Sequence, residues 1–285
     1  MPILFLLAVM FGFTAGEEVN IMSFNIRYGA ANDGINSWEN RKEFVYETIK
    51  REKYDFIGVQ EALGFQIEFI KEKMDGYHVF SRGREKNPTK GESCGIFYSD
   101  SWEIDVEESG TFWLSENPQK PASKNWDASL PRITTWARFM HKKTGFSIYV
   151  YNTHFDHLGQ TARENSSKII IKHISARKYD IPVILIGDFN ASETNEAIKT
   201  IKKGIPQGPS FFDPWNFLNP NSKKRGTFNS WESRKDGAKI DYIFVLEGTQ
   251  VLDAQILRET FQGRNPSDHY PVTAKVLASS SLGDY

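Results

Sequence analysis

The sequence predicts an α/β protein in which two β-sheets pack face to face and helices cover their outer faces. Many short apolar segments of strand length occur along the chain, segments with helical spacing lie between them, and long loops follow several strands. Strands at this density are typical of two packed sheets, and the interleaved helices indicate the α/β class. No internal repeat or low-complexity linker divides the chain, so we expect a single domain over residues 17–285.

The first four elements alternate between strand and helix. They are expected at residues 19–27, 38–53, 56–60 and 65–74. The helices are inferred from apolar side chains such as Phe44, Val45 and Ile49, which recur at helical spacing among charges. The second strand is a continuous apolar run, which is typical of a strand buried on both faces, and it delivers Glu61 at its carboxyl end.

The rest of the chain is richer in strands. Further strands are expected at residues 77–81, 95–98, 133–140, 146–152, 183–187, 240–245 and 270–276, and further helices at 162–178 and 194–203. The longest irregular stretch is 118–131. A loop of that length in a compact domain is more often functional than idle.

Composition and charge exclude some classes of protein. The chain has 285 residues, 39% of them hydrophobic, and a net charge of −1 at pH 7. Domains that coat nucleic acid electrostatically are usually strongly basic, so this charge argues against such a role. The single cysteine, Cys94, excludes an intrachain disulfide and a cysteine-built zinc site. Oxygen or imidazole ligands must therefore hold any metal, which favours Mg²⁺, Mn²⁺ or Ca²⁺.

The N-terminal segment resembles a secretory leader. Residues 2–13 are almost wholly apolar, and Thr14, Ala15 and Gly16 follow them before the first charged residues, as at a small-residue cleavage site. The apolar run is too short to span a bilayer comfortably. Because no Lys or Arg precedes it, an uncleaved anchor or a buried first strand is the alternative. We expect residues 1–16 to be a signal peptide and the protein to be secreted or periplasmic.

Acidic and amide residues recur at the ends of the predicted strands. A lone acid in this position is usually a turn or helix-capping residue. Six such residues here are harder to explain in that way. They are Asn25, Glu61, Asp188, Asn190, Asp241 and Asp268. Converging acidic and amide oxygens are what a hard divalent cation needs, and it fills its other positions with water and substrate phosphate. The set therefore predicts a metal-assisted phosphoester hydrolase.

The ordered motifs resemble the endonuclease/exonuclease/phosphatase superfamily, which has the DNase I-like fold. They are Ser23-Phe24-Asn25, Gln60-Glu61, Asn152-Thr153-His154, Gly187-Asp188-Phe189-Asn190, Ile240-Asp241-Tyr242 and Ser267-Asp268-His269. One motif alone would be weak, and the specificity comes from the order and spacing of six over residues 19–277. The resemblance implies a four-layered α/β sandwich, with two central, mostly antiparallel sheets flanked by helices and the active site at one sheet edge. Residues 111–138 depart from nuclease prototypes and look more like bacterial metal-dependent hydrolases of unassigned substrate.

The resemblance also implies roles for individual residues. Glu61 is the expected principal Mg²⁺ ligand, helped by Asn25 and Asp268, and Mn²⁺ is an alternative metal. Asp241 and His269 resemble the family's hydrogen-bonded pair, in which the carboxylate fixes the imidazole tautomer and stabilises its charged form.

Three further residues are expected to act on the phosphate. Asp188 and Asn190 would orient the attacking water and hold a non-bridging oxygen, and His154 would be a second donor to the phosphate. The implied mechanism is in-line attack of water on phosphorus. Asp188 and His269 are both candidates for the proton acceptor, and the sequence does not choose between them.

Two arginines are candidates for substrate contacts. Arg132 lies directly before the strand expected at 133–140, and a guanidinium fork matches phosphate bidentately. Arg163 follows His154 closely, although a solvent-facing position on a helix is the commoner outcome for such an arginine.

Three hypotheses of function follow. The first is a divalent-metal-dependent phosphodiesterase or nuclease. The second is a phosphomonoesterase or phospholipid-head-group hydrolase, since inositol phosphatases and sphingomyelinases share these motifs. The third is a catalytically inactive binding module, but Glu61, Asp188 and His269, whose loss would mark it, are all present. We expect a phosphoester substrate, either nucleic acid or a phosphorylated small molecule, no obligate protein partner, and a monomer.

Overall fold

The structure is a computed structural model, and it describes residues 16–206 and 208–279. Apart from Gly16, the predicted leader at residues 1–16 lies outside this part of the chain. The elements are β1 (Glu17–Asn25), the 3-10 helix η1 (Gly34–Asn36), α1 (Trp38–Ile49), β2 (Phe56–Ala62), α2 (Gly64–Lys73), β3 (Tyr77–Phe80), β4 (Ser93–Ser99), β5 (Trp102–Trp113), β6 (Ile133–His141), β7 (Ser147–His154), α3 (Gln160–Ser175), β8 (Val183–Asp188), α4 (Glu196–Lys203), β9 (Phe211–Phe212), α5 (Pro214–Leu218), β10 (Asp241–Leu246), β11 (Gln250–Ile256) and β12 (Val272–Ala278).

Two six-stranded sheets form the centre of the molecule. The strand order is β11-β12-β1-β2-β4-β3 in the first sheet and β5-β6-β7-β8-β10-β9 in the second. Each sheet contains one parallel pair, β1 with β2 and β7 with β8, and its other pairs are antiparallel. A parallel pair needs a crossover connection, which α1 and α3 provide. The predicted, mostly antiparallel arrangement is confirmed.

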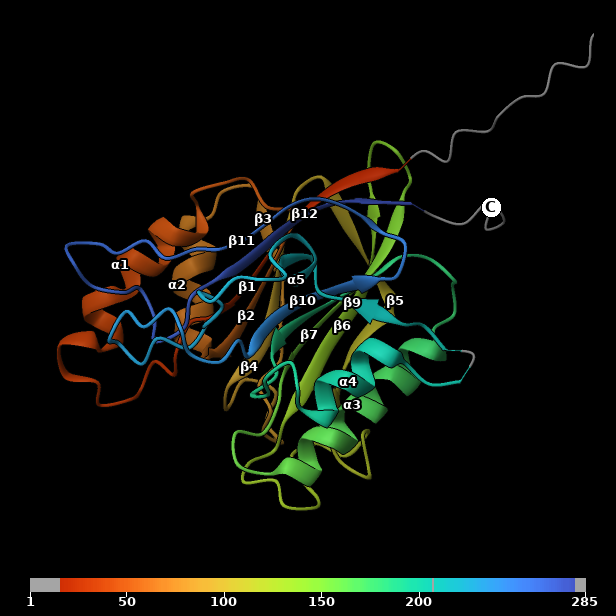
Figure 1. Cartoon of the computed structure of the whole chain (residues 1–285), viewed down its shortest axis with the longest axis horizontal. Coiled ribbons are helices and arrows are strands. Elements are labelled where there is room, and N and C mark those ends of the chain that lie inside the picture. Colours follow the sequence, from red (N-terminus) through yellow and green to blue (C-terminus); the bar gives the residue numbers. More distant parts are fainter. Residues whose placement is uncertain (1–15, 207, 280–285) are drawn as a thin grey trace, which may run out of the picture.

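Apolar side chains organise the molecule into four layers (Figure 1). The two sheets bury a common core that includes Phe56, Phe139 and Ile186. Successive side chains of a strand point to opposite faces, so in β1 Ile21 enters this core while Met22 packs towards the helices. Helices α1 and α2 cover the outer face of the first sheet, and α3 and α4 cover that of the second. The predicted four-layered sandwich is therefore confirmed.

Two buried amides connect the sheets beneath the candidate site. Asn152 of β7 donates its Nδ2 to the carbonyl oxygens of Val59 and Gly95, at 3.0 and 2.8 Å. Its Oδ1 accepts from Gln60 Nε2 at 2.7 Å. Because Gln60 directly precedes Glu61, these bonds fix the position of one sheet against the other next to the predicted metal ligand.

The structure contains elements that the sequence did not predict, namely η1, β5, β9, β11 and α5. The middle of β5 carries exposed and half-buried polar residues, and its register against β6 shifts between Asp105 and Ser109. This bulge interrupts the alternation that marks a strand. The stretch expected to be irregular, 118–131, contains neither helix nor strand. Of the helices in the described ranges, none has the length and apolar character needed to cross a membrane.

Candidate active site

Strand ends from both sheets meet at one edge. The parallel strands β1 and β2 finish together there, and so do β7 and β8, with His154 opposite Asp188. β10 is antiparallel to β8 and therefore begins at this edge, where Asp241 faces Asp188. The segment before β12 returns to it because β12 is antiparallel to β1. The strand order thus brings together Asn25, Glu61, His154, Asp188, Asn190, Asp241, Asp268 and His269.

Glu61 has a backbone conformation that is unusual for a residue with a side chain. Its φ is 59°, and the register of β2 against β4 shifts between Val59 and Ala62. A left-handed backbone costs a non-glycine residue roughly 1–2 kcal/mol. The carboxylate is held by two donors, the backbone N–H of Tyr28 at 2.6 Å from Oε2 and Asn25 Nδ2 at 3.1 Å from Oε1. Strain kept at such a position is typical of a functional residue.

Asp188 is buried at the centre of the site. Its Oδ1 accepts from the backbone N–H of Asn190 at 2.9 Å, and its Oδ2 accepts from Asn25 Nδ2 at 2.9 Å. The same Oδ2 lies 3.4 Å from His154 Nε2 and 3.8 Å from His269 Nε2. Burial raises the pKa of Asp188 to about 7. A carboxyl group that titrates near neutrality is well suited to proton transfer.

The residues around Asp188 show why its motif has this composition. A Cβ on Gly187 would lie 2.2 Å from the carbonyl oxygen of Thr153, so only glycine allows β7 and β8 to approach this closely. Asn190 has a φ of 46°, a left-handed conformation that asparagine tolerates better than most residues. Phe189, between the two polar residues, is fully buried and anchors the turn in the apolar core beneath α3 and α4.

His269 and Asp241 form a buried charged pair. His269 Nδ1 lies 2.9 Å from Asp241 Oδ2 and 3.2 Å from Oδ1. Burial by itself lowers the pKa of His269, but the carboxylates of Asp241 and Asp188 outweigh it and raise that pKa well above its usual value. The imidazolium therefore donates Nδ1–H to Asp241 and keeps Nε2–H for the cleft. Thr227 Oγ1 accepts from the Asp241 backbone N–H at 3.1 Å and helps to fix this strand end.

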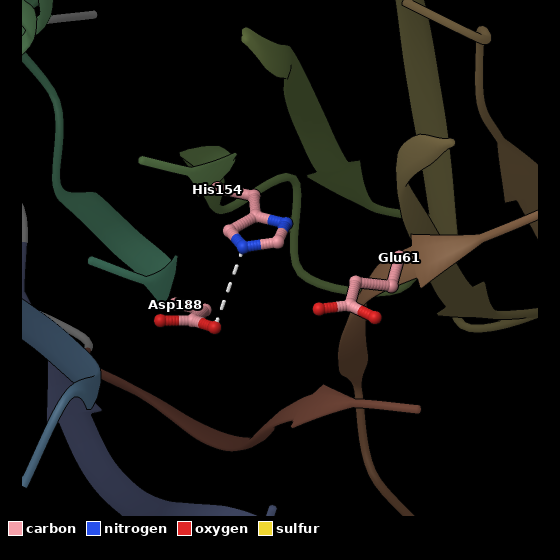
Figure 2. A group of neighbouring side chains, drawn as sticks. All are labelled: Glu61, His154 and Asp188. Carbon is pink, nitrogen blue, oxygen red and sulfur yellow. Dashed lines mark ion pairs between the residues drawn. The ribbon is translucent and has the colours of Figure 1, made fainter. Parts of the chain in front are cut away.

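His154 is a buried, neutral imidazole between Arg132 and Asp188. Arg132 Nη1 lies 3.0 Å from His154 Nδ1. Burial, followed by the positive charge of Arg132, lowers the pKa of His154 well below its usual value. Figure 2 shows the other ring nitrogen turned towards Asp188, with the Glu61 carboxylate facing the same space. Asn190 Nδ2 lies 3.1 Å from His154 Nε2 and closes this side of the site.

The donor atoms fit a hard divalent cation. Glu61, His154 and Asp188 offer ligand atoms within 4.8 Å of one another, and so do Asp188, Asp241 and His269. The second group contains a protonated imidazole, which has no lone pair for a metal. The first group offers two carboxylates in an open cleft, as Mg²⁺ and Mn²⁺ prefer. Glu61 and Asp188 are therefore the residues best placed to hold an ion.

The other two predicted metal ligands are Asp268, which lines the cleft, and Asn25, which is buried beside it. Asn25 Oδ1 accepts from the backbone N–H of Arg27 at 2.9 Å, and its Nδ2 faces the carboxylates of Glu61 and Asp188. Asp268 Oδ2 lies 3.7 Å from Arg27 Nη1. Burial raises the pKa of Asp268. In this arrangement Asn25 orients the two carboxylates, and the ligand roles of Asn25 and Asp268 stay predictions.

The two predicted substrate arginines have different positions. Arg132 lines the cleft, but it is 6% exposed and its guanidinium faces two histidines, one of them His154. Arg163 is not among the described residues that line the cleft. Its Nη1 donates to the carbonyl oxygen of Asp156 at 2.9 Å and its Nη2 to Gln160 Oε1 at 2.8 Å. The first turn of α3 thus directs Arg163 onto the turn that precedes the helix, and its phosphate contact stays a prediction.

The cleft has a volume of about 400 Å³ and includes residues to which the sequence assigned no role. These are Arg27, Tyr28, Glu92, Leu130, His157, Phe228 and Ile240. Arg27 and Tyr28 come directly after the Asn25 motif, so an extension of that motif could have found them. Glu92 and Phe228 reach the cleft from the start of β4 and from the loop before β10, and no local sequence signal indicates this.

Comparison with known proteins agrees with this architecture. Residues 22–269 match the family model described as Endonuclease/Exonuclease/phosphatase family. An endonuclease/exonuclease/phosphatase from Bacteroides vulgatus is 33% identical, with a TM-score of 0.82 and coverage of 92% of this chain and 100% of that one. A mannosyl-6-phosphatase from Bacteroides thetaiotaomicron is 32% identical, with a TM-score of 0.81 and coverage of 91% and 99%.

A more distant relative has the same region within a longer protein. Nocturnin of Drosophila melanogaster is 22% identical over 90% of this chain, which spans only 45% of the nocturnin sequence. The family match extends from β1 to His269 and so contains every strand end that forms the site. The chain belongs to the endonuclease/exonuclease/phosphatase family.

Proposed function

We propose that the protein is a divalent-metal-dependent hydrolase of small phosphomonoesters, with phosphorylated carbohydrates as its substrate class. The observation that carries this proposal is the cleft itself, where Glu61 and Asp188 face the buried Arg132 and His154 within about 400 Å³. A phosphomonoester is a dianion, so it needs cationic and N–H donors in addition to a metal ion. A cleft of this volume suits a small molecule. The 32% identical neighbour described as a mannosyl-6-phosphatase supports the same class.

Glu61 and Asp188 would hold the ion, with Asn25 orienting both carboxylates. A bound divalent ion would neutralise charge on the phosphate and lower the pKa of a bound water. The protein's own contribution is to fix these oxygens before substrate binds, since each Glu61 oxygen already accepts a hydrogen bond.

Asp188 is the better candidate for the proton acceptor. His269 has a raised pKa and already carries its proton, which leaves Asp188, through the carboxylate oxygen that does not hold the ion. His269 would then act through Nε2–H as a charged donor to the phosphate or to the leaving oxygen. His154 and Asn190 would donate to phosphate oxygens as negative charge grows on them.

A phosphodiesterase or nuclease activity, the first hypothesis from the sequence, is the second candidate. Tyr28 and Phe228 line the cleft and are 37% and 41% exposed. Aromatic faces at a phosphate site can stack on nucleobases, which is how many proteins bind single strands.

The test compares three substrates in parallel: mannose 6-phosphate, bis(p-nitrophenyl) phosphate and a supercoiled plasmid, each with Mg²⁺, with Mn²⁺ and with EDTA. We expect phosphate release from the monoester that EDTA abolishes and that Glu61→Gln lowers by at least about 100-fold. Glu103→Gln, on the exposed side of β5, is the matched control. Cleavage of the diester or plasmid without monoester hydrolysis would favour the second candidate, and activity in EDTA would contradict the metal requirement.

We also infer that the protein is exported, because residues 1–16 resemble a signal peptide. N-terminal sequencing of protein recovered from the medium or periplasm should begin at Glu17. An intact leader on protein found only in the cytoplasm would contradict export.

A further inference from the structure

One guanidinium contacts two imidazoles at the cleft. Arg132 Nη1 lies 3.0 Å from His154 Nδ1, and Nη2 lies 3.1 Å from His157 Nδ1. All three side chains line the cleft, and Arg132 and His154 are the most buried of the three. Each terminal nitrogen of the Arg132 guanidinium therefore contacts one histidine. In both histidines the contacted atom is Nδ1.

These contacts determine which ring nitrogens carry protons. A guanidinium only donates hydrogen bonds and stays protonated in proteins. The Nδ1 atoms of His154 and His157 must therefore accept, which leaves the ring proton of each on Nε2. Each ring then presents an N–H donor on the side away from Arg132. On His154 this Nε2–H faces Asp188 Oδ2 at 3.4 Å, so the approach of Asn190 Nδ2 to the same nitrogen, at 3.1 Å, is a contact and not a hydrogen bond.

We propose that Arg132 is a positioning residue that fixes His154 and His157 together as Nε2–H tautomers, and that His157 is a second imidazole donor to the phosphate of the substrate. This rests on the proposed function, because it concerns how the same cleft takes a phosphomonoester. A monoester has three non-bridging oxygens and a diester has two. A second imidazole donor therefore favours the monoester.

The surroundings hold Arg132 in this position. Glu92 Oε2 lies 3.9 Å from Nη1, and Asp156 Oδ2 lies 3.7 Å from Nε. Asp156 also accepts from the backbone N–H and the Oγ of Ser129, at 3.0 and 2.7 Å. Asp156 directly precedes His157 in the chain, and Ser129 is three residues before Arg132. The same carboxylate thus lies beside the arginine and orders the turn that carries the histidine.

The first measurement determines the tautomers directly. Long-range ¹H–¹⁵N correlation spectra of protein labelled with ¹⁵N-histidine, recorded with Mg²⁺ present, separate protonated from unprotonated ring nitrogens. His154→Gln and His157→Gln assign the signals. We expect Nε2–H on both rings in the wild type and mixed tautomers in Arg132→Met. If that variant does not fold, Arg132→Lys, which offers one ammonium group in place of the fork, should lose the fixed tautomer of at least one ring.

Arg138→Met is the matched control, because Arg138 is a half-buried arginine on β6 that pairs with Asp105 at 2.9 Å. It should leave both tautomers unchanged. Nδ1–H on either ring of the wild type, or unchanged tautomers in the folded Arg132 variant, would overturn the positioning role.

The second measurement tests His157 as a substrate contact. His157→Phe removes the donor, whereas His157→Gln keeps an amide N–H near the position of Nε2. We expect His157→Phe to raise KM for p-nitrophenyl phosphate about tenfold, equivalent to about 1.4 kcal/mol, with kcat changed less than about threefold. KM for bis(p-nitrophenyl) phosphate should rise less, and His157→Gln should restore most of the loss.

An unchanged monoester KM in His157→Phe would overturn the substrate contact. If the wild type hydrolyses neither ester nor mannose 6-phosphate, the proposed function and the role of His157 both fail. The spectra still decide the role of Arg132 in that case, so the two failures are distinguishable.

Discussion

Asp188, Asp241 and His269 share one buried cluster but hold their protons differently. Asp241 and His269 form an ion pair at 2.9 Å, while Asp188, 3.8 Å from the same imidazole, has a pKa of about 7. Two carboxylates and one imidazolium therefore provide a fixed cation and a group that can accept a proton at neutral pH. When neighbouring groups in one site have different pKa values, one can act as the acid and another as the base.

Replacement of Asp241 tests the fixed cation. Asp241→Asn keeps the shape of the side chain but cannot stabilise the charged imidazole of His269, so kcat should fall by about 10²- to 10⁴-fold. The measurement is steady-state kinetics together with thermal unfolding to verify the fold. Asp253→Asn, exposed on β11, serves as the control. A kcat close to that of the wild type would rule out this role for the pair.

The raised pKa of Asp188 has a consequence for stability. The Asp188 carboxyl binds its proton more tightly in the folded state than in the unfolded state, where the pKa has the ordinary value of 3.8. The stabilisation that this proton gives to the folded state is therefore complete below about pH 4 and is lost as pH rises through about 7. Between about pH 4 and pH 7 this stabilisation contributes at most about 4 kcal/mol to the free energy of unfolding. Urea unfolding in EDTA should show the free energy of unfolding of the wild type falling relative to Asp188→Asn from pH 4 to pH 8. Parallel pH profiles of the two proteins would contradict the raised pKa.

The loop between β5 and β6, residues 114–132, is the element that shapes the cleft. Asp127 within it accepts from the backbone N–H groups of Thr161 and Ala162 in the first turn of α3. In return, Asp156 before α3 accepts from the loop at Ser129 and Leu130. Loop and helix therefore fix each other, and the loop contributes Leu130 and Arg132 to the cleft wall.

Asp156 should be the most sensitive residue of this arrangement. Burial alone would raise its pKa, but hydrogen bonds from Gly159, Ser129 and other donors lower that pKa to about 2. Its stabilising effect is therefore present above about pH 4 and is lost as pH falls towards 2. We expect Asp156→Ala to lower the free energy of unfolding at pH 7 by about 2–4 kcal/mol and to raise KM. Asp75→Ala, on an exposed turn, should change neither quantity, and an unaltered KM in Asp156→Ala would separate the loop from substrate binding.

At the scale of the whole molecule, the site is divided between two crossover units. β1-α1-β2 of the first sheet supplies Asn25 and Glu61, and β7-α3-β8 of the second supplies His154 and Asp188. Neither unit alone contains both residues proposed to hold the ion, Glu61 and Asp188. The relative position of the sheets, which the Asn152 hydrogen bonds help to fix, is therefore a property of the active site as much as of the core.

Asn152→Ala tests this dependence. It removes three buried hydrogen bonds, two to carbonyl oxygens and one from the Gln60 amide, and we expect the free energy of unfolding to fall by about 2–4 kcal/mol. Affinity for Mg²⁺, measured by calorimetry, should fall too, although Asn152 is not a ligand. Asn32→Ala, at an exposed position, is the control. Unchanged metal affinity would show that the site tolerates movement between the sheets.

The sequence predicts the parts of this molecule that local patterns encode. The apolar runs before Glu61 and Asp188 are recognisable because both are buried strands, and the motif order identifies the fold. The sequence does not predict β5, because its bulge near Val106 interrupts the alternation of apolar and polar residues that marks a strand. The left-handed backbone of Glu61 and the contacts from Arg132 to His154 and His157 arise only from tertiary structure, across 22 and 25 residues in the case of the contacts.

The pairing of β1 with β12 also sets the order in which this enzyme can be completed. Glu17 lies opposite Ala278, so the first sheet stays open until residues from both ends of the described chain are present. Proteins begin to fold from the N-terminal side while the ribosome is still adding residues. Asp268 and His269 are added just before β12, after every strand of the second sheet. A chain that ends before residue 267 would keep Glu61 and Asp188 but lack their imidazolium, and we expect hydrolysis only from chains in which β12 has closed against β1.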